Sequence, residues 1–536
     1  MEDTYEDVHK VTHHTATYED AHEDAHEDAH EGAHEDAHEG AHEGAHEDAH
    51  EGAHEDAHED AHEDVHDVVV IGGGPGGEVV ADRIVRSGLT AVVVEAEAVG
   101  GECSYRACVP SKALLRPGAA REAALAVDGA RQAVTAALDP AQVLARRDRF
   151  TGRGDDAGQA AWLKGAGIPL VRGHGRLTGE RRVEVTGTDG TVRVLPARLA
   201  VVLATGTEPV LPPVEGLDRI GVWTNRQATT ADAVPERLVV IGGGVVACEM
   251  ATAWSSLGSS VTLLVRDQAL LTGWEPCAGE EVVRGLTALG VTIRFGVSAT
   301  RVARDDTTRA VTVETDDGAA LVCDEILVAV GRRPRTADLG LEAVGLPAGD
   351  WLPADDTCRV TAHAGDWLYA VGDVNHRAPL THMAKYQARA CAAAISERAA
   401  GRPADTGGGQ AWSAEADRFA VPQAVFTHPE IASVGLTERA AREAGLAVRA
   451  VEYRIDDVAG AALYADDYRG HAKLVVDETR GVVVGCTLTG PMATELIHTA
   501  TVAIVGEVPL TRLRHAVPAF PTVSEVWLRL LEAYGL

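Results

Sequence analysis

Two stretches of the chain repeat the same order of apolar and polar positions. Residues 67–71 form a short apolar run that enters a glycine-rich loop, a helical stretch follows to Ser87, and a second apolar run covers residues 90–95. The same order recurs at residues 238–244, 245–257 and 261–265. Apolar runs that alternate with helices predict strand-helix-strand units around a parallel sheet. We therefore expect an α/β fold with two Rossmann-like dinucleotide-binding domains.

The remaining segments predict two further parts of the fold. Strands are expected at residues 182–194 and 199–203, and a β-rich stretch ends near Gly331, after which comes the run Leu368-Tyr-Ala-Val-Gly-Asp373. From about Pro422, strands at 473–476 and 482–486 precede helical segments, which is typical of a separate α+β domain. The expected domains are residues 67–215 and 336–415 for the first dinucleotide unit, 216–335 for the second, and 416–536 for the α+β unit.

A low-complexity tail precedes these domains. Residues 21–64 are eleven copies of Ala-His-Glu-(Asp/Gly), and residues 1–66 hold 24 acidic residues against the single Lys10. With almost no apolar surface, this tail is expected to be disordered or at most transiently helical. Its histidines recur every four residues, a spacing at which residues 22–66 can clamp Zn, Ni or Cu; the alternative is a plain solvated acidic tail.

Charge and cysteine content narrow the class of protein. The tail accounts for −23 of the net charge of −33, and the remaining −10 does not favour nucleic acid or anionic membranes as partners. Eight cysteines with one closely spaced pair indicate a reducing compartment. The acidic start of the chain resembles neither a secretory signal nor a transit peptide, and no long apolar run predicts a membrane span. The expected location is the cytoplasm.

Both glycine loops carry dinucleotide-binding signals. Gly72, Gly74 and Gly77 match GxGxxG, and Glu95 ends the next strand, where an acid binds an adenosine ribose. The second loop has Gly242 and Gly244, with Ala247 at the third glycine position. Its second strand ends at Arg266 in place of an acid, which favours NADPH over NADH unless Arg266 is merely solvated.

The cysteine pair Cys103 and Cys108 is the most specific signal. On a regular helix, residues five apart have Cα atoms about 8.6 Å from each other, beyond the roughly 7 Å that a disulfide tolerates. If the two cysteines bond, the segment must be distorted. Pro110 suits the first turn of a helix whose positive end lowers the pKa of a nearby cysteine. Arg106 lies between them and either holds Cys103 as a thiolate or is exposed and inert.

Together these motifs resemble the class I pyridine nucleotide-disulfide oxidoreductases, the flavin disulfide reductases that include dihydrolipoamide dehydrogenase and mercuric reductase. The resemblance covers about residues 67–536 and rests on both glycine loops, CxxxxCxPSK at residues 103–112, Ala-Thr-Gly at 204–206, Gly372-Asp373 and the stretch 422–435. It implies FAD on the first unit, NAD(P)H on the second, and a homodimer formed by the C-terminal domain.

The resemblance also implies roles for individual residues. Cys103 becomes the interchange thiol that faces substrate, and Cys108 the charge-transfer thiol that faces the flavin. Lys112 and Glu249 become an ion pair beside the flavin, and Asp373 lies near the ribityl chain. Lys112, Thr205, Gly206, Gly331 and Gly372 complete the expected cofactor-binding set. The six other cysteines are expected to be small apolar fillers: Cys248, Cys277, Cys323, Cys358, Cys391 and Cys486.

One catalytic position departs from the family. The acid/base site is normally His-Pro-Thr followed by a Glu, supplied across the dimer interface, whereas this chain has Phe520 in place of the histidine and keeps Glu525. Phenylalanine cannot transfer a proton, and losing a general acid/base typically costs a factor of about 10² to 10⁴ in rate. His515 either substitutes or is simply exposed. Mercuric reductase also lacks this histidine, but its C-terminal cysteine pair is absent here.

The sequence therefore predicts an FAD-dependent enzyme. Electrons are expected to pass from NAD(P)H through FAD to the Cys103–Cys108 disulfide, and on to an unidentified acceptor such as a quinone, a soft metal ion or a disulfide. One alternative is a dihydrolipoamide dehydrogenase. Another is a metal-binding or storage protein that uses the histidine-rich tail.

Overall fold

The computed structural model describes residues 65–404 and 408–536. The predictions for the repeat tail lie outside these residues. The first domain is built on a seven-stranded sheet in which β1 lies at the centre and pairs in parallel with β2 and β6. Its strands, in spatial order, are β3 (Leu170–Arg172), β2 (Ala91–Glu95), β1 (His66–Ile71), β6 (Val192–Leu203), β5 (Arg182–Thr186) and β4 (His174–Gly179), with β16 (Leu368–Ala370) also paired to β6.

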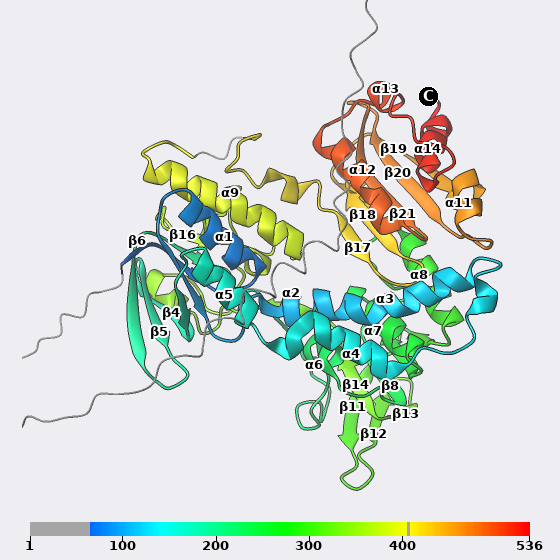
Figure 1. Cartoon of the computed structure of the whole chain (residues 1–536), viewed down its shortest axis with the longest axis horizontal. Coiled ribbons are helices and arrows are strands. Elements are labelled where there is room, and N and C mark those ends of the chain that lie inside the picture. Colours follow the sequence, from blue (N-terminus) through cyan, green and yellow to red (C-terminus); the bar gives the residue numbers. More distant parts are fainter. Residues whose placement is uncertain (1–64, 405–407) are drawn as a thin grey trace, which may run out of the picture. The chain divides into compact units, whose positions relative to one another are not determined.

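The buried strand β1 leads directly into the first glycine loop and helix α1 (Pro75–Arg86). Residues 68–70 of β1 are fully buried because apolar side chains of α1 pack on one face of the sheet and those of β4 and β5 pack on the other. Pro75 occupies the first turn of α1, where a missing N–H has no cost. Helix α9 (Thr381–Ala399) packs along α1, and Figure 1 shows the two side by side. The segment after residue 336 therefore returns to the first domain through both β16 and α9.

The prediction of two separate strands at residues 182–194 and 199–203 is wrong in detail. A hairpin joins β5 to β6, and β6 then continues through Pro196 as one strand of 12 residues. Its first half pairs with β5, and its second half pairs in parallel with β1 and β16. Pro196 is accommodated where the strand changes partners, so its missing N–H interrupts neither ladder.

The second domain repeats the parallel arrangement. Its four-stranded sheet has the order β10 (Thr292–Phe295), β9 (Ser260–Val265), β8 (Arg237–Ile241) and β14 (Glu325–Val328). Beside it lie the antiparallel strands β11 (Ala299–Arg304), β12 (Val311–Thr315) and β13 (Ala320–Cys323), and the helices α6 (Asn225–Thr230), α7 (Val245–Ser256) and α8 (Pro276–Ala288). The short pair β7 (Thr207–Pro209) and β15 (Arg332–Pro334) connects the two domains.

The C-terminal domain is an antiparallel sheet covered by helices. The strand order is β17 (Gln423–Val425), β18 (Ile431–Gly435), β21 (Val482–Thr489), β20 (His471–Asp477) and β19 (Val448–Arg454). Its helices are α10 (Glu438–Glu443), α11 (Ala459–Tyr464), α12 (Ala493–Val505), α13 (Leu510–Leu513) and α14 (Val526–Tyr534). The predicted fold class, two Rossmann-like domains and an α+β domain, is thus confirmed. The exact domain boundaries stay predictions.

The remaining helices belong to the first domain and carry or support the cysteine segment. They are α2 (Gly101–Tyr105), α3 (Cys108–Leu125), α4 (Pro140–Thr151) and α5 (Ala157–Gly165). In the part of the chain that the structure describes, no helix combines the length and the apolarity that a bilayer span needs.

Candidate redox site

The two cysteines of the CxxxxC segment lie on separate helices. Helix α2 ends at Tyr105, the backbone leaves helical geometry at Ala107 (φ −145°, ψ −94°), and α3 begins at Cys108. This break brings the two thiols within hydrogen-bonding reach of each other. The predicted distortion of the segment is therefore present, and Pro110 lies in the first turn of α3.

The two thiols have opposite acidities. The hydrogen bond from Cys103 lowers the pKa of Cys108 to about 6 against the opposing effect of burial, with further help from Thr381 and Lys112. The same hydrogen bond, together with burial, raises the pKa of Cys103. Thr381 Oγ1 lies 3.2 Å from Cys108 Sγ and comes from the first turn of α9. In the reduced pair, Cys108 is the thiolate at neutral pH and Cys103 keeps its proton.

Arg106 does not act on the pair as hypothesised. Its guanidinium forms an ion pair with Glu97, and the cation that lowers the pKa of Cys103 is Lys385, whose effect is outweighed. The hypothesis of a Cys103 thiolate held by Arg106 is therefore wrong.

Lys112 and Glu249 form the ion pair that the resemblance implies. Lys112 Nζ donates to Glu249 Oε2 at 2.8 Å, and Glu249 is only 3% exposed. The other oxygen, Oε1, accepts a hydrogen bond of 3.0 Å from the backbone N–H of Phe426, and the Lys112 ammonium lies 5.0 Å from the centre of the Phe426 ring. One buried carboxylate thus ties α3 of the first domain and α7 of the second domain to the start of the C-terminal domain.

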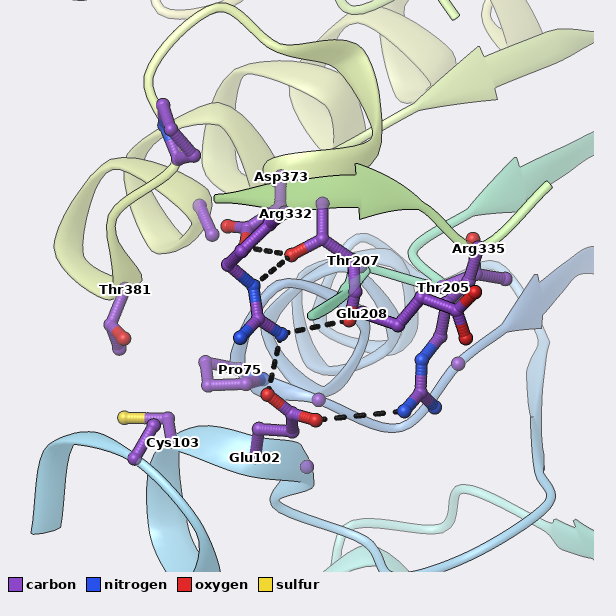
Figure 2. A pocket seen from close by; sticks show the side chains of 18 of the residues that line it. Pro75, Glu102, Cys103, Thr205, Thr207, Glu208, Arg332, Arg335, Asp373 and Thr381 are labelled. Atoms are coloured by element: carbon purple, nitrogen blue, oxygen red, sulfur yellow. Dashed lines mark hydrogen bonds and ion pairs between the residues drawn. The ribbon is translucent and has the colours of Figure 1, made fainter. Parts of the chain in front are cut away.

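A cavity of about 1380 Å³ brings most of the predicted site residues together. Figure 2 shows part of its lining, including Cys103, Thr205, Asp373 and Thr381. The predicted residues that line it are Gly72, Gly74, Glu95, Cys103, Cys108, Lys112, Thr205, Gly206, Glu249, Gly372 and Asp373. Those that do not are Gly77, Gly242, Gly244, Arg266, Gly331 and Glu525.

The first glycine loop fits a dinucleotide. A Cβ at Gly77 would lie 1.9 Å from the carbonyl oxygen of Gly72, and one at Gly72 (φ 105°) would lie 2.4 Å from that of Ala204. Both glycines are therefore required for the loop to fold back on the sheet. Gly74 caps α1 without a side chain, which leaves the N–H groups of the first turn free for a phosphate.

Polar groups around this loop fit the rest of an FAD molecule. Glu95 ends β2 and accepts a hydrogen bond of 2.6 Å from the N–H of Gly73. Thr205 Oγ1 is buried without a protein partner. Burial raises the pKa of Asp373, which accepts a hydrogen bond of 2.9 Å from Thr207. Buried polar groups normally form hydrogen bonds, so Thr205 needs a partner that the described residues do not provide. Thr205 and Asp373 are therefore suited to bind a ligand rich in hydroxyl groups.

The second glycine loop follows the same construction on the second sheet. Gly242 (φ 136°) follows β8, and a Cβ there would lie 2.3 Å from the carbonyl oxygen of Ala329. Gly244 caps α7 with open space beside it. Gly331 lies between β14 and β15, and Arg266 follows β9 with its side chain 85% exposed, 3.7 Å from Asp267. The preference for NADPH stays a prediction.

The C-terminal segment in which the family has its acid/base site exposes residue 520. Phe520 is 76% exposed, and His515 is exposed with no contact that reaches the cavity. Glu525 is buried and accepts a hydrogen bond of 2.6 Å from Arg529 Nη2, while its Oε2 has no protein partner. The other six cysteines carry free thiols, five of them buried and Cys277 partly so, which agrees with a filler role.

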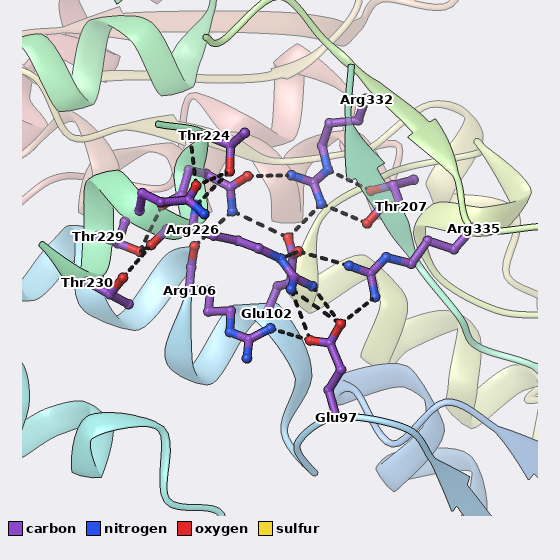
Figure 3. Close-up of polar contacts among 12 residues, drawn as sticks. Glu97, Glu102, Arg106, Thr207, Thr224, Arg226, Thr229, Thr230, Arg332 and Arg335 are labelled. Carbon is purple, nitrogen blue, oxygen red and sulfur yellow. Dashed lines mark hydrogen bonds and ion pairs between the residues drawn. The ribbon is translucent and has the colours of Figure 1, made fainter. Parts of the chain in front are cut away.

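The structure adds residues that sequence reasoning missed. Thr381 contacts Cys108 from a position 273 residues away, and no local signal marks it. Glu102 and Arg332 join a polar network at the cavity wall (Figure 3). The basic run at residues 331–335 was a signal for this network.

Comparison with known proteins defines the class. Residues 66–388 match the family model described as pyridine nucleotide-disulphide oxidoreductase, and residues 421–530 match its dimerisation domain. The chain belongs to this family, and it is an FAD-dependent oxidoreductase that uses a nicotinamide nucleotide, NAD(H) in its relatives.

Individual relatives are similar over nearly their whole length. The chain is 34% identical to the dihydrolipoyl dehydrogenase of Haloferax volcanii, covering 87% of this chain and 95% of the relative, and 32% identical to that of Bacillus subtilis, covering 87% and 96%. Among solved structures, LpdA from Mycobacterium tuberculosis matches with a TM-score of 0.73 and 27% identity, covering 88% of this chain and 100% of LpdA.

Proposed function

We propose that this enzyme takes electrons from NAD(P)H and delivers them, through Cys103 and Cys108, to an acceptor that needs no histidine proton relay. Quinones and soft metal ions meet this description. The observation that carries the proposal is that Cys103 and Cys108 line one cavity with the first glycine loop, where Thr381 and the Lys112–Glu249 ion pair accompany Cys108. Bound FAD supplies the two-electron chemistry that links the nicotinamide to this pair.

Side chains of the cavity would hold the FAD and stabilise the Cys108 thiolate. Gly74 and the first turn of α1 would hold the FAD phosphates, and Asp373 and Thr205 its hydroxyl groups. Lys112 lowers the pKa of Cys108, and Glu249 keeps the lysine in place. When the reduced pair closes to a disulfide, it releases two electrons and the single proton of Cys103.

The destination of that proton distinguishes the candidate acceptors. Phe520 has no titratable group and cannot accept the proton of Cys103 from either subunit of a dimer. A soft metal ion binds thiolate sulfur directly, and a quinone takes its protons from water. Both acceptors are therefore less affected by the missing histidine than a dithiol or disulfide substrate.

A dihydrolipoyl dehydrogenase is the second candidate. It is favoured by the names of the relatives, which are 30–34% identical to this chain. It predicts rapid NAD-linked oxidation of dihydrolipoamide despite Phe520. We further propose that the dimerisation domain forms a homodimer, that Arg266 favours NADPH, and that the enzyme works in the cytoplasm.

A substrate panel tests the proposal. Lipoamide, glutathione disulfide, quinones, Hg(II) and Cu(II) are compared with NADPH and with NADH, and we expect turnover with a quinone or a metal ion to exceed that with lipoamide. Faster NAD-linked lipoamide turnover supports the second candidate instead. Anaerobic titration with NADPH separates both from a metal-storage protein: the expected long-wavelength thiolate-to-flavin absorbance disappears in Cys108→Ser, and a failure to reduce the flavin refutes an enzymatic role.

A further inference from the structure

A network of six charged side chains borders the cavity beside α2. It contains four arginines and two glutamates, and therefore carries a net charge of +2: Arg106, Arg226, Arg332, Arg335, Glu97 and Glu102. The members come from three segments of the fold: the stretch from β2 through α2 in the first domain, α6 in the second, and β15 with the residue that follows it (Figure 3). All six line the cavity.

Glu102 is the centre of this network. Its Oε1 accepts a hydrogen bond of 2.7 Å from Arg226 Nε, and its Oε2 one of 2.6 Å from Arg332 Nη2. Arg335 Nη2 lies 3.5 Å from Oε1. The Glu102 side chain is 19% exposed. Although burial opposes it, the charge of Arg332 and the hydrogen bond from Arg226 hold the pKa of Glu102 below its usual value. The Glu102 carboxylate therefore joins Arg226, Arg332 and Arg335. Glu97 is a second acidic partner of Arg226 and Arg335, and Glu102 is the one of the two that also pairs with Arg332.

This network borders the phosphate-binding end of α1. Gly101, the residue before Glu102, packs on the first glycine loop so closely that a Cβ there would lie 2.9 Å from Gly74 Cα. Figure 2 shows Glu102, Arg332 and Arg335 around Pro75, the first residue of α1. A dinucleotide pyrophosphate is anionic, so the positive net charge of the network favours its binding here.

We propose that Glu102 is a positioning residue for the FAD pyrophosphate. It acts through Arg226 and Arg332, which it fixes at the cavity wall beside the glycine loop. The proposal rests on the FAD dependence of the family and not on the identity of the acceptor, so it stands or falls separately from the proposed function. It also makes FAD binding depend on Arg226, a residue of the second domain.

The sign of the effect separates positioning from simple charge. Replacing Glu102 by glutamine raises the net charge of the network from +2 to +3, so a purely electrostatic role predicts tighter FAD binding. Positioning predicts weaker binding, because Arg226 and Arg332 lose the charged carboxylate that joins them. Among the described residues, Arg226 then keeps only its pairing with Glu97, and Arg332 only its hydrogen bonds to Thr207 and Asn225. Glu102→Asp keeps the charge but shortens the reach, so only positioning predicts an effect for it.

The experiment is a titration of the FAD-free full-length protein with FAD, followed by flavin fluorescence. We expect Glu102→Gln and Glu102→Asp to raise the Kd for FAD on the order of tenfold, the loss typical of hydrogen bonds to charged groups. Glu281→Gln is the matched control, because Glu281 also pairs with an arginine, Arg284, but lies on α8 away from the cavity. Its Kd should equal that of the wild type.

Two further measurements complete the test. In an Arg332→Gln background, Glu102→Gln should have a smaller additional effect than in the wild type, because one of the two arginines through which it acts is already gone. ADP, which contains the pyrophosphate, should compete less well in Glu102→Gln, whereas riboflavin, which lacks it, should be unaffected. Unchanged or tighter FAD binding in both Glu102 variants overturns the proposal, as does an equal loss of ADP and riboflavin. If Glu102→Gln fails to fold, judged by circular dichroism, Glu102→Asp carries the same comparison.

Discussion

The contact between Thr381 and Cys108 allows a quantitative test of the thiolate assignment. The pKa of Cys108 falls from 9.0 to about 6, and Thr381 is one of the groups that lower it. Thr381→Val preserves the shape of the side chain and removes the hydroxyl. A hydrogen bond to a charged group contributes about 1.5–3 kcal/mol, and one pKa unit corresponds to about 1.4 kcal/mol. Because sulfur accepts more weakly than oxygen, we take the lower end and expect a rise of about one unit.

The rise in the pKa of Cys108 lowers its thiolate fraction near pH 6.5. The thiolate is present above the pKa and is lost as the pH falls through it, so a higher pKa removes thiolate from the range between pH 6 and 7. At pH 6.5 we expect the thiolate fraction of Cys108 to fall from roughly three-quarters to roughly one-quarter in the variant.

Alkylation of the reduced protein measures this fraction at one cysteine. Trypsin cleaves after Arg106 and Lys112, so Cys108 is recovered on a peptide that does not contain Cys103. The rate of Cys108 alkylation is followed against pH by mass spectrometry, since only the thiolate reacts. Thr381→Ser keeps the hydroxyl and should restore the wild-type midpoint, and Thr287→Val, on the exposed face of α8, should leave it unchanged. A midpoint that does not move in Thr381→Val refutes the assignment.

Three other substitutions test the site and its surroundings. Glu249→Gln leaves the half-buried Lys112 without its charged partner, and we expect urea denaturation to show a loss of about 1–3 kcal/mol in unfolding free energy; an unchanged midpoint contradicts a structural role for the pair. Burial raises the pKa of Glu78 from 4.5 to about 7, so the folded state holds an extra proton in this window and loses stability as the pH rises through it. Glu78→Gln should remove this loss, at most about 3 kcal/mol, when unfolding free energies at pH 5 and pH 8 are compared; equal pH dependence in both proteins contradicts it. Phe520→His should raise kcat for dihydrolipoamide by about tenfold or more in steady-state assays, and the absence of any gain shows that a proton relay at residue 520 is not limiting.

Local geometry made the core of the site predictable. A regular helix would keep Cys103 and Cys108 too far apart to bond, so a distortion between them was predictable. The structure has this distortion as the break in helical geometry at Ala107. The glycine loop was predictable for a similar reason, since Gly72 and Gly77 each lie where a Cβ has no room. In both cases the constraint acts within a few residues, so the sequence displays it directly.

Partners from distant segments were not predictable in the same way. Thr381 meets Cys108 only because α9 returns to α1, which requires the whole parallel sheet to be in place. Arg106 was a plausible partner for Cys103 because the two are close in sequence, but in the folded chain Arg106 forms an ion pair with Glu97. The continuous strand β6 was missed because its two halves pair with different strands, which a pattern of alternating residues does not reveal.

Glu525 has structural contacts that do not depend on catalysis, and its catalytic role stays a prediction. Its carboxylate is buried at the start of α14. There it accepts a hydrogen bond from Arg529 one turn later, and an acid at a helix N-terminus is stabilising in its own right. The contact with Arg529 and the helix dipole therefore explain the position of Oε1 without a catalytic role. The other, Oε2, is buried without a partner in the described part of the chain, so it is the atom to which a histidine introduced at position 520 would have to connect.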